Sequence, residues 1–377
     1  MTRAAEPDDV TPRQRMWSAA RSARLLLSKE RPLSAVEQLH ALAESPHAAN
    51  DDAVDVYGDG VVGVVEERVA KLLGKPAAVW FPSGIMAQQA VLREWVSRAG
   101  TSRIAVHPLH HTQVHEESAF TTLSALEPVI LTAERRQPLA ADLDALVGPL
   151  AAAVVELPFQ ELGYLLPTWT QLCDFAAAAR HRGTPLHLDG SRLWESRFSL
   201  GHSPAEIAAL ADSVYVSMYK GIGGLSGAVV AGDADLIEQL RVWRVRYGGN
   251  LFKQFPAIVS ALDGLDHRLD RMPLWHEHAR VVADGLRPLA ELVLPHDPPH
   301  ISEFWVWSEL PADALNRAMF EHWESDSERW IHGWWTGSDG RSVAEVTIRD
   351  PALDWSAADV TRVGRRVLDR AIELSAQ

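Results

Sequence analysis

The chain has 377 residues, enough for a large core and two domains. Of these residues, 47% are hydrophobic and 23% are charged, which is typical of a globular protein. The net charge of -14 at pH 7 argues against a nucleic-acid partner, because a phosphate backbone would be repelled. The single cysteine, Cys173, excludes an intramolecular disulfide. Since neither an apolar signal segment nor a membrane-spanning stretch is visible, we expect a cytoplasmic protein with no membrane partner.

The N-terminal two thirds of the chain predict an α/β fold. Residues 1–48 form a polar tail followed by helical sequence around Gln14 to Ala43. Residues 49–270 alternate short β-rich segments with alanine- and leucine-rich stretches, which predicts a large domain with a mostly parallel seven-stranded sheet covered on both faces. The expected strands lie near residues 77–81, 103–107, 128–132, 152–156, 186–189, 213–219 and 227–231.

Residues 271–377 differ in pattern and predict a small C-terminal α+β domain. Tryptophan is abundant in this part of the chain. We favour packing in the core or at a subunit interface over the lining of a substrate entrance, although large rings could do either. The expected elements are helices at His276 to Leu292, Ala312 to Trp323 and Ala357 to Leu374, and strands near 301–308 and 343–348.

A candidate phosphate site follows the first expected strand. The apolar segment Ala77 to Phe81 leads through a proline into Ser83, Gly84 and Ile85, and a helix-forming run comes next. Free backbone amides at a helix N-terminus, with a serine hydroxyl beside them, suit the phosphate of an ester. Taken by itself, this motif is better explained by an ordinary helix-capping serine.

Histidines recur every four residues at His107, His111 and His115, and Glu116 comes directly after them. This spacing raises the question of a metal site. Pro108 would disturb a single continuous helix through all three histidines, so we predict no metal. For His107, His110 and His115 we favour structural or solvated roles.

Asp189 ends the apolar segment Leu186 to Asp189, which reads as a short strand after a turn. In an α/β protein the carboxyl ends of the strands are where ligands bind. A carboxylate placed there would keep the pyridine nitrogen of pyridoxal 5'-phosphate protonated and so make the ring an electron sink. An Asp-Gly pair alone more often marks only a turn.

Lys220 ends a second apolar run, which starts at Ser213 and breaks into glycines after the lysine. An ammonium group resists dehydration unless its pKa is lowered or it is bonded covalently. A lysine that forms a Schiff base with a cofactor meets this condition, whereas a lysine that merely emerges into solvent is the alternative. Ser83-Gly84, Asp189 and Lys220 then supply a phosphate cup, a pyridinium partner and an amine for one cofactor.

The order of these motifs resembles the fold-type-I enzymes that depend on pyridoxal 5'-phosphate. More specifically, the chain is similar to the low-specificity L-threonine aldolase, or β-eliminating lyase, family over roughly residues 50 to 265. Besides the segments already named, this resemblance rests on Tyr57 to Gly60, on Leu72 to Lys75, and on Arg241 to Gly249.

The resemblance implies roles for further residues. His111 would stack on the cofactor ring and move a proton, and Arg192 would hold the substrate carboxylate through its guanidinium fork. Tyr57 and Arg341 are further candidates for substrate binding. Lys253 is a candidate for the cofactor phosphate, at the place where the family usually has an arginine that reaches a neighbouring subunit. A homodimer or homotetramer with active sites at the subunit interface is implied in the same way.

One departure from the family concerns the chemistry directly. Aldolases usually have Glu-Asn-Thr-His where this chain has Glu156-Leu-Pro-Phe-Gln160-Glu161, so the histidine that is a candidate base for the β-hydroxyl is missing. Retro-aldol cleavage needs such a base within hydrogen-bond reach. His111, Glu161 or a bound water would have to supply it.

The predicted function is cleavage of the Cα–Cβ bond of a β-hydroxy-α-amino acid to glycine and an aldehyde, with pyridoxal 5'-phosphate as the cofactor and an amino acid as the small-molecule substrate. Amino-acid racemisation and β-elimination or β-replacement use the same cofactor residues and are the alternatives. A non-catalytic binding protein is a different class of interpretation. The joint presence of Lys220, Asp189 and Arg192 argues against it, because a binding protein has no use for an electron sink.

Overall fold

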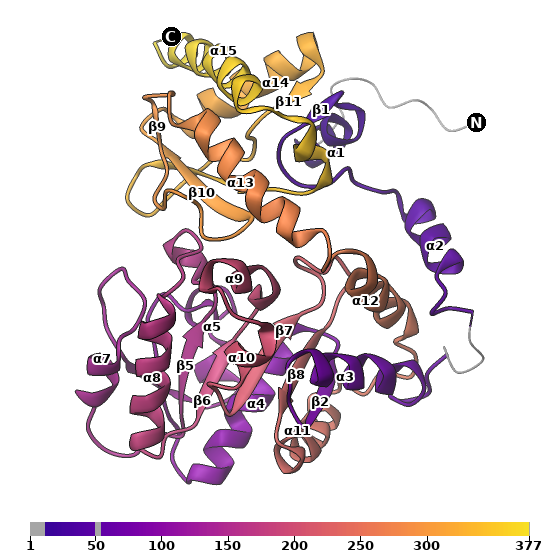
Figure 1. The fold of residues 1–377 in the computed structure, drawn as a ribbon, viewed down its shortest axis with the longest axis vertical. Helices are drawn as coiled ribbons and strands as arrows, with labels where there is room; N and C mark the ends of the chain where they lie inside the picture. The colour runs from indigo at the N-terminus through magenta and orange to yellow at the C-terminus, as the bar shows by residue number, and fades with distance from the viewer. Residues whose placement is uncertain (1–11, 50–53, 377) are drawn as a thin grey trace. The chain divides into compact units, whose positions relative to one another are not determined.

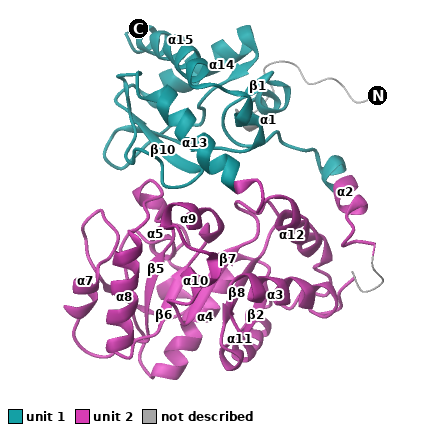
Figure 2. Cartoon of the chain, viewed as in Figure 1, with its two compact units in different colours: residues 1–39, 273–377 teal, residues 40–272 magenta. Residues whose placement is uncertain are grey.

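The computed structural model describes residues 12–49 and 54–376. These residues form two compact units (Figure 2): the described part of 1–39 together with 273–376, and the described part of 40–272. The first eleven residues of the predicted N-terminal tail lie outside the described residues, and the division into residues 1–48, 49–270 and 271–377 remains a prediction. Among the described residues, no helix is both long enough and apolar enough to cross a membrane.

The larger unit is built on a mixed sheet of seven strands in the order β2-β8-β7-β6-β5-β3-β4, with helices around it (Figure 1). Strand β8 is antiparallel to its neighbours β2 and β7, and the other neighbouring strands pair in parallel. The predicted mostly parallel α/β architecture is therefore confirmed. The strands are β2 (Ala77–Phe81), β3 (Arg103–Val106), β4 (Glu127–Ile130), β5 (Ala152–Glu156), β6 (Leu186–Asp189), β7 (Ser213–Ser217) and β8 (Ala228–Gly232).

Strands β2, β5, β7 and β8 are buried along almost all of their length, as expected for strands that helices cover. Helix α4 packs across β2, β5, β7 and β8, and its Ala87, Val91 and Trp95 join the buried core of the sheet. The helices of this unit are α3 (Val61–Leu72), α4 (Gly84–Ala99), α5 (His111–Val114), α6 (Ala119–Thr122), α7 (Ala140–Asp144), α8 (Trp169–His181), α9 (Leu193–Leu200), α10 (Pro204–Ala208), α11 (Ala234–Arg246) and α12 (Phe255–His267), with a 3-10 turn at Gln160–Leu162.

The smaller unit contains an antiparallel sheet in the order β12-β13-β10-β9 and a parallel pair, β1 with β11. Trp305, Trp330, Trp334 and Trp355 are buried in it, which agrees with the favoured packing role. Its elements are α1 (Pro12–Ser22), β1 (Leu25–Leu26), β9 (Leu292–Val293), β10 (Glu303–Ser308), α14 (Ala312–Asp326), β11 (Glu328–Arg329), β12 (Trp335–Thr336), β13 (Ser342–Thr347), a 3-10 turn at Asp350–Asp354 and α15 (Ala357–Ser375). Helices α2 (Ala35–Glu44) and α13 (Met272–Leu286) contain the points where the two units divide.

Helix α13 and strand β7 are among the predicted elements that end earlier than expected. Helix α13 stops at Leu286 rather than Leu292, because Pro288 has no amide hydrogen and its ring clashes with the preceding turn. Strand β7 stops at Ser217 rather than at residue 219, so Lys220 lies in the loop after the strand. In that loop the Gly224 amide donates a hydrogen bond to the Met218 carbonyl at 2.8 Å, an approach that leaves no room for a Cβ.

Candidate active site

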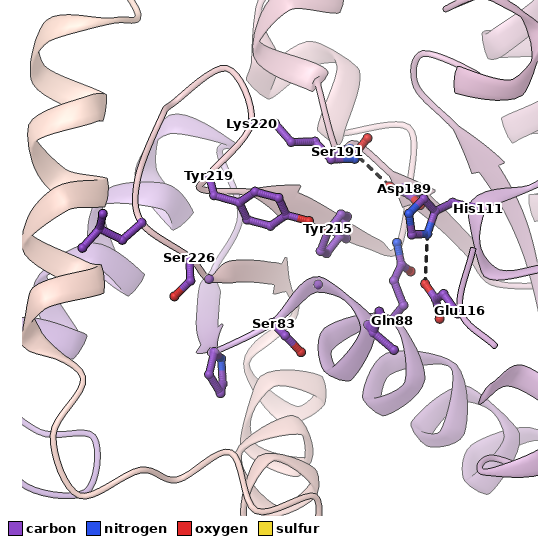
Figure 3. Close-up of a pocket in the computed structure, with 15 residues that line it drawn as sticks. Ser83, Gln88, His111, Glu116, Asp189, Ser191, Tyr215, Tyr219, Lys220 and Ser226 are labelled. Carbon is purple, nitrogen blue, oxygen red and sulfur yellow. Dashed lines mark hydrogen bonds and ion pairs between the residues drawn. The ribbon is translucent and has the colours of Figure 1, made fainter. Parts of the chain in front are cut away.

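A cavity of about 280 Å³ opens at the carboxyl end of the central strands of the larger unit. Six of the residues predicted from the sequence line it, and they come from the ends or following loops of β2, β3, β6 and β7 (Figure 3). The carboxyl ends of parallel strands meet at one edge of a sheet, so residues far apart in the chain converge there. The six are Ser83, Gly84, Ile85, His111, Asp189 and Lys220.

The wall after β2 is the N-terminus of α4. Ser83 has extended backbone angles and caps the helix, with its hydroxyl oxygen accepting a hydrogen bond from the Met86 amide at 3.3 Å. A Cβ at Gly84 would overlap the hydroxyl oxygen of Tyr215, so only glycine fits between the helix and that ring. The backbone therefore lies bare at the cavity wall, as a phosphate cradle requires.

Asp189 lies at the end of β6 and is only 2% exposed. One of its carboxylate oxygens accepts a hydrogen bond from the Ser191 amide at 3.2 Å (Figure 3). Burial raises the pKa of the Asp189 carboxyl, whereas the nearby cationic groups of Lys220 and His111 act in the opposite direction. A buried carboxylate that faces a cavity in this way is suited to a cationic ligand group.

His111 lies at the start of α5, and its ring Nδ1 is 3.1 Å from a carboxylate oxygen of Glu116 (Figure 3). The Gln89 amide holds Glu116 in turn, at 2.7 Å. Burial lowers the pKa of His111, but the hydrogen bond to Glu116 and the charge of Asp189 outweigh this effect, so that the net pKa is raised. His111 is thus a histidine that lines the cavity and is oriented by Glu116.

The three regularly spaced histidines have different partners. His107 Nε2 lies 2.9 Å from the Glu134 carbonyl oxygen, His111 bonds to Glu116, and His115 Nε2 is 2.7 Å from a Glu161 carboxylate oxygen. Within the described ranges, the cluster whose ligand atoms are close enough to share a metal is a separate one, made of His47, Asp263 and Asp266. Arg68 and His47 already form ion pairs with Asp266 there.

Four further predicted residues do not line the cavity. Arg192 is buried at the start of α9, where Nη2 donates to the Tyr164 hydroxyl at 3.2 Å and the guanidinium lies over the Tyr164 ring. Tyr57 and Lys253 both contact Phe252. The ring of Tyr57 meets it edge-on at 5.3 Å between centroids, and Lys253 Nζ lies 5.2 Å from its centroid.

Arg341 belongs to the smaller unit. There its guanidinium stacks on Trp307 at 3.9 Å and pairs with Asp339 at 2.6 Å. The predicted substrate or cofactor roles of Arg192, Tyr57, Lys253 and Arg341 remain predictions.

The structure adds cavity residues that the sequence reasoning missed: Gln88, Glu116, Ser191, Tyr215, Tyr219 and Ser226. Tyr215 is paired in register with Asp189 on the adjacent strand, so both side chains emerge on the same face of the sheet. Side chains alternate between the two faces of a strand, so the run from Ser213 to Ser217 predicts that Tyr215 lies on the same face as the two serines. Nothing local marks Ser226 or Gln88 as cavity residues.

Comparisons with known proteins agree with this site. The beta-eliminating lyase family matches residues 40–302. A Listeria monocytogenes crystal structure provisionally assigned as an L-allo-threonine aldolase is 31% identical, with a TM-score of 0.87 over 94% of this chain and 99% of that one. An Exiguobacterium structure provisionally assigned as an aromatic amino acid beta-eliminating lyase/threonine aldolase is 30% identical, with the same TM-score and coverage.

Curated sequences point the same way. Low-specificity L-threonine aldolase 1 of Arabidopsis thaliana is 26% identical over 278 residues, which cover 69% of this chain and 73% of the plant protein. The match to the family covers well over half of the chain and includes every element that contributes to the cavity. The chain therefore belongs to the beta-eliminating lyase family.

Proposed function

We propose that this chain is a lyase that depends on pyridoxal 5'-phosphate and cleaves the Cα–Cβ bond of a β-hydroxy-α-amino acid, giving glycine and an aldehyde. The observation that carries the proposal is the convergence of Lys220, Asp189 and the Ser83-Gly84 helix start on one cavity (Figure 3). The similarity to proteins named threonine aldolases supports this reaction over racemisation or elimination.

The residues present fit the cofactor. Gly84 keeps the backbone bare where a phosphate would lie, Asp189 offers a buried carboxylate for a pyridinium nitrogen, and Lys220 offers an amine for covalent attachment. Ile85 adds its backbone to the phosphate wall, and Lys253 remains the proposed point charge from a neighbouring subunit. When bound, pyridoxal 5'-phosphate supplies the electron sink for the electrons of the broken Cα–Cβ bond.

The chain itself must orient the substrate and move a proton. We assign the β-hydroxyl proton to His111, because it lines the cavity and Glu116 fixes and supports its ring. Glu161, the other side chain considered as the base, forms an ion pair with His115 at 2.7 Å. Arg192 is proposed for the substrate carboxylate, and engaging it would require exchange of its contact with Tyr164. Tyr57 and Arg341 are proposed as further contacts to the substrate.

A homodimer or homotetramer in the cytoplasm is the proposed setting. Two loops of the larger unit meet through a hydrogen bond from the Tyr57 amide to the Phe252 carbonyl, and both rings are more than half exposed, as expected of a surface that a second subunit covers. Lys253 follows directly in the chain, which supports its proposed role at an active site shared between subunits.

The test combines product analysis with a lysine variant. The protein loaded with pyridoxal 5'-phosphate is incubated with L-threonine, L-allo-threonine, L-alanine and L-serine, and the products are identified. We expect acetaldehyde plus glycine from a threonine isomer, and we expect Lys220→Ala to abolish the reaction. Lys71→Ala, an exposed residue of α3, is the matched control and should behave like the wild type.

Borohydride reduction followed by peptide mapping asks directly whether Lys220 carries the cofactor. Label on another lysine would refute the site assignment. Racemised alanine, or pyruvate from serine, in the absence of aldehyde release from either threonine isomer would refute the reaction while leaving the cofactor assignment intact.

A further inference from the structure

Three neighbouring strand ends place an additional histidine and a second carboxyl group behind Asp189. His110 follows β3, Glu156 ends β5 and Asp189 ends β6, and these strands are adjacent in the sheet. Glu156 and Asp189 face each other in register. The three side chains are almost completely buried, with 1%, 3% and 2% of their surface exposed, respectively.

The hydrogen bonds of His110 fix its tautomer. The Thr112 amide donates to Nδ1 of His110 at 3.2 Å, and the Thr112 hydroxyl oxygen lies 2.9 Å from the same nitrogen. With Nδ1 accepting the amide hydrogen bond, the ring proton is on Nε2. Nε2 lies 3.6 Å from Asp189 Oδ2 and 3.9 Å from Glu156 Oε2. It has no hydrogen-bond partner among the residues that the structure describes. A buried N–H donor therefore points at two carboxyl groups, closer to Asp189.

The two carboxyl groups compete for one negative charge. Burial and then the charge of Asp189 raise the pKa of Glu156 to about 7. Two like charges this close in a buried site are costly, so near neutral pH the pair holds a proton. Glu156 accepts hydrogen bonds from two backbone amides, those of His111 and Gln160, whereas Asp189 accepts one, from Ser191. The backbone alone thus favours the charge on Glu156.

We propose that His110 is a positioning residue that keeps the negative charge on Asp189 rather than on Glu156, and so keeps Asp189 able to hold a cofactor pyridinium. The proposal rests on the proposed function. The second backbone amide at Glu156 favours the charge on Glu156. The Nε2–H group of His110 acts in the opposite direction, because it lies nearer to Asp189 than to Glu156. Lys220 and His111 also favour the charge on Asp189, whereas Glu116 opposes it. Loss of the His110 donor shifts the shared proton toward Asp189 against these cations and so weakens the attraction of Asp189 for the pyridinium.

The substitution that isolates this effect is His110→Asn. His110 is the N-cap of α5, and asparagine is a good N-cap that can still accept from the Thr112 amide while lacking the Nε2–H group. We expect pyridoxal 5'-phosphate to bind to the variant apoenzyme about tenfold more weakly, because the buried N–H dipole 3.6 Å from Asp189 no longer stabilises the charge of that carboxylate. Binding is followed by the visible absorbance of the cofactor as it is titrated in.

Rescue separates this role from a merely structural one. In His110→Asn/Glu156→Gln the competing carboxyl is gone, so the charge returns to Asp189 and the cofactor affinity should recover to near the wild-type value. Glu156→Gln alone should bind the cofactor at least as tightly as the wild type, and it tests the proposal even if His110→Asn does not fold. His107→Asn, in the same segment but hydrogen-bonded to the Glu134 carbonyl, is the matched control and should keep wild-type affinity.

The proposal is overturned if His110→Asn binds the cofactor like the wild type, or if Glu156→Gln fails to restore binding in the double variant. It is also overturned if Glu156→Gln alone weakens binding about tenfold. A wild-type protein that takes up no pyridoxal 5'-phosphate would instead refute the proposed function, and this inference with it. The two failures are thus distinguishable.

Discussion

Replacing Gly84 by alanine is expected to weaken cofactor binding through a steric effect. The new methyl group would overlap the hydroxyl oxygen of Tyr215 and would lie 3.2 Å from its Cζ. Tyr215 is 4% exposed and sits in the core under α4, so it has little room to move. Overpacking of this kind costs about 1–3 kcal/mol. If the strain is relieved by displacing the helix start, the affinity for pyridoxal 5'-phosphate falls about 5-fold to 150-fold.

The assay is a titration of apoenzyme with pyridoxal 5'-phosphate, together with urea unfolding of the same preparations. Tyr215→Phe removes the overlapping oxygen, so Gly84→Ala/Tyr215→Phe should recover most of the lost affinity. The matched control is Gly63→Ala on α3, where a Cβ would meet nothing within 4 Å. That control should leave cofactor affinity unchanged and raise stability by about 0.5–1 kcal/mol, as alanine does in place of glycine within a helix.

The steric reasoning would be refuted by a Gly84→Ala protein that binds the cofactor as tightly as the wild type. It would also fail if Tyr215→Phe gave no recovery, because the contact with the hydroxyl would then not be the cause of the loss. Equal loss from Gly63→Ala would point to a general effect of substitution rather than to the cavity wall.

Two further predictions concern stability. His187 hydrogen-bonds to Ser213 and Gln88, and burial lowers its pKa to about 3. As the pH falls below about 6.5, the unfolded chain binds a proton at this histidine and the folded protein does not. The free energy of unfolding therefore decreases as the pH falls through this range. Between pH 7 and pH 5 the wild type should lose about 2 kcal/mol more than His187→Gln in urea unfolding, and parallel curves would contradict this. Arg349→Met removes the guanidinium that lies 2.5 Å from the buried carboxylate of Glu303 and should destabilise the smaller unit by about 3–5 kcal/mol, measured by thermal unfolding. A loss within 1 kcal/mol would show that Glu303 becomes protonated at little cost.

The sequence was sufficient for the secondary structure around the site because the signals there are local. The apolar segments before Ser83 and Asp189 coincide with β2 and β6, since each is short, β-prone and bounded by turn residues. The early end of β7 before Lys220 was not predicted, because the apolar run continues through Met218 and Tyr219 while the backbone already turns toward Gly224. Side-chain type does not report that change of direction.

The partners of individual side chains were beyond the sequence. Arg192 was assigned to a substrate carboxylate by resemblance, and its contact with Tyr164 arises from a loop that is distant in the chain. Likewise His110 reads as one histidine in a histidine-rich segment, and only the adjacency of β3, β5 and β6 places it against Glu156 and Asp189. Such contacts depend on strand order and on the face from which each side chain emerges.

What the sequence by itself determined was the set of chemical groups and the elements that carry them: a serine-glycine helix start, an aspartate at a strand end and a lysine before glycines. What only the tertiary structure decided was which groups meet. Tyr215 covers Gly84, and Asp189 and Lys220 line the same cavity as Ser83, because the sheet brings separate strand ends to one edge. Local propensities act over a few residues, whereas a cavity is defined by packing between elements separated by a hundred residues or more, and no local pattern encodes that distance.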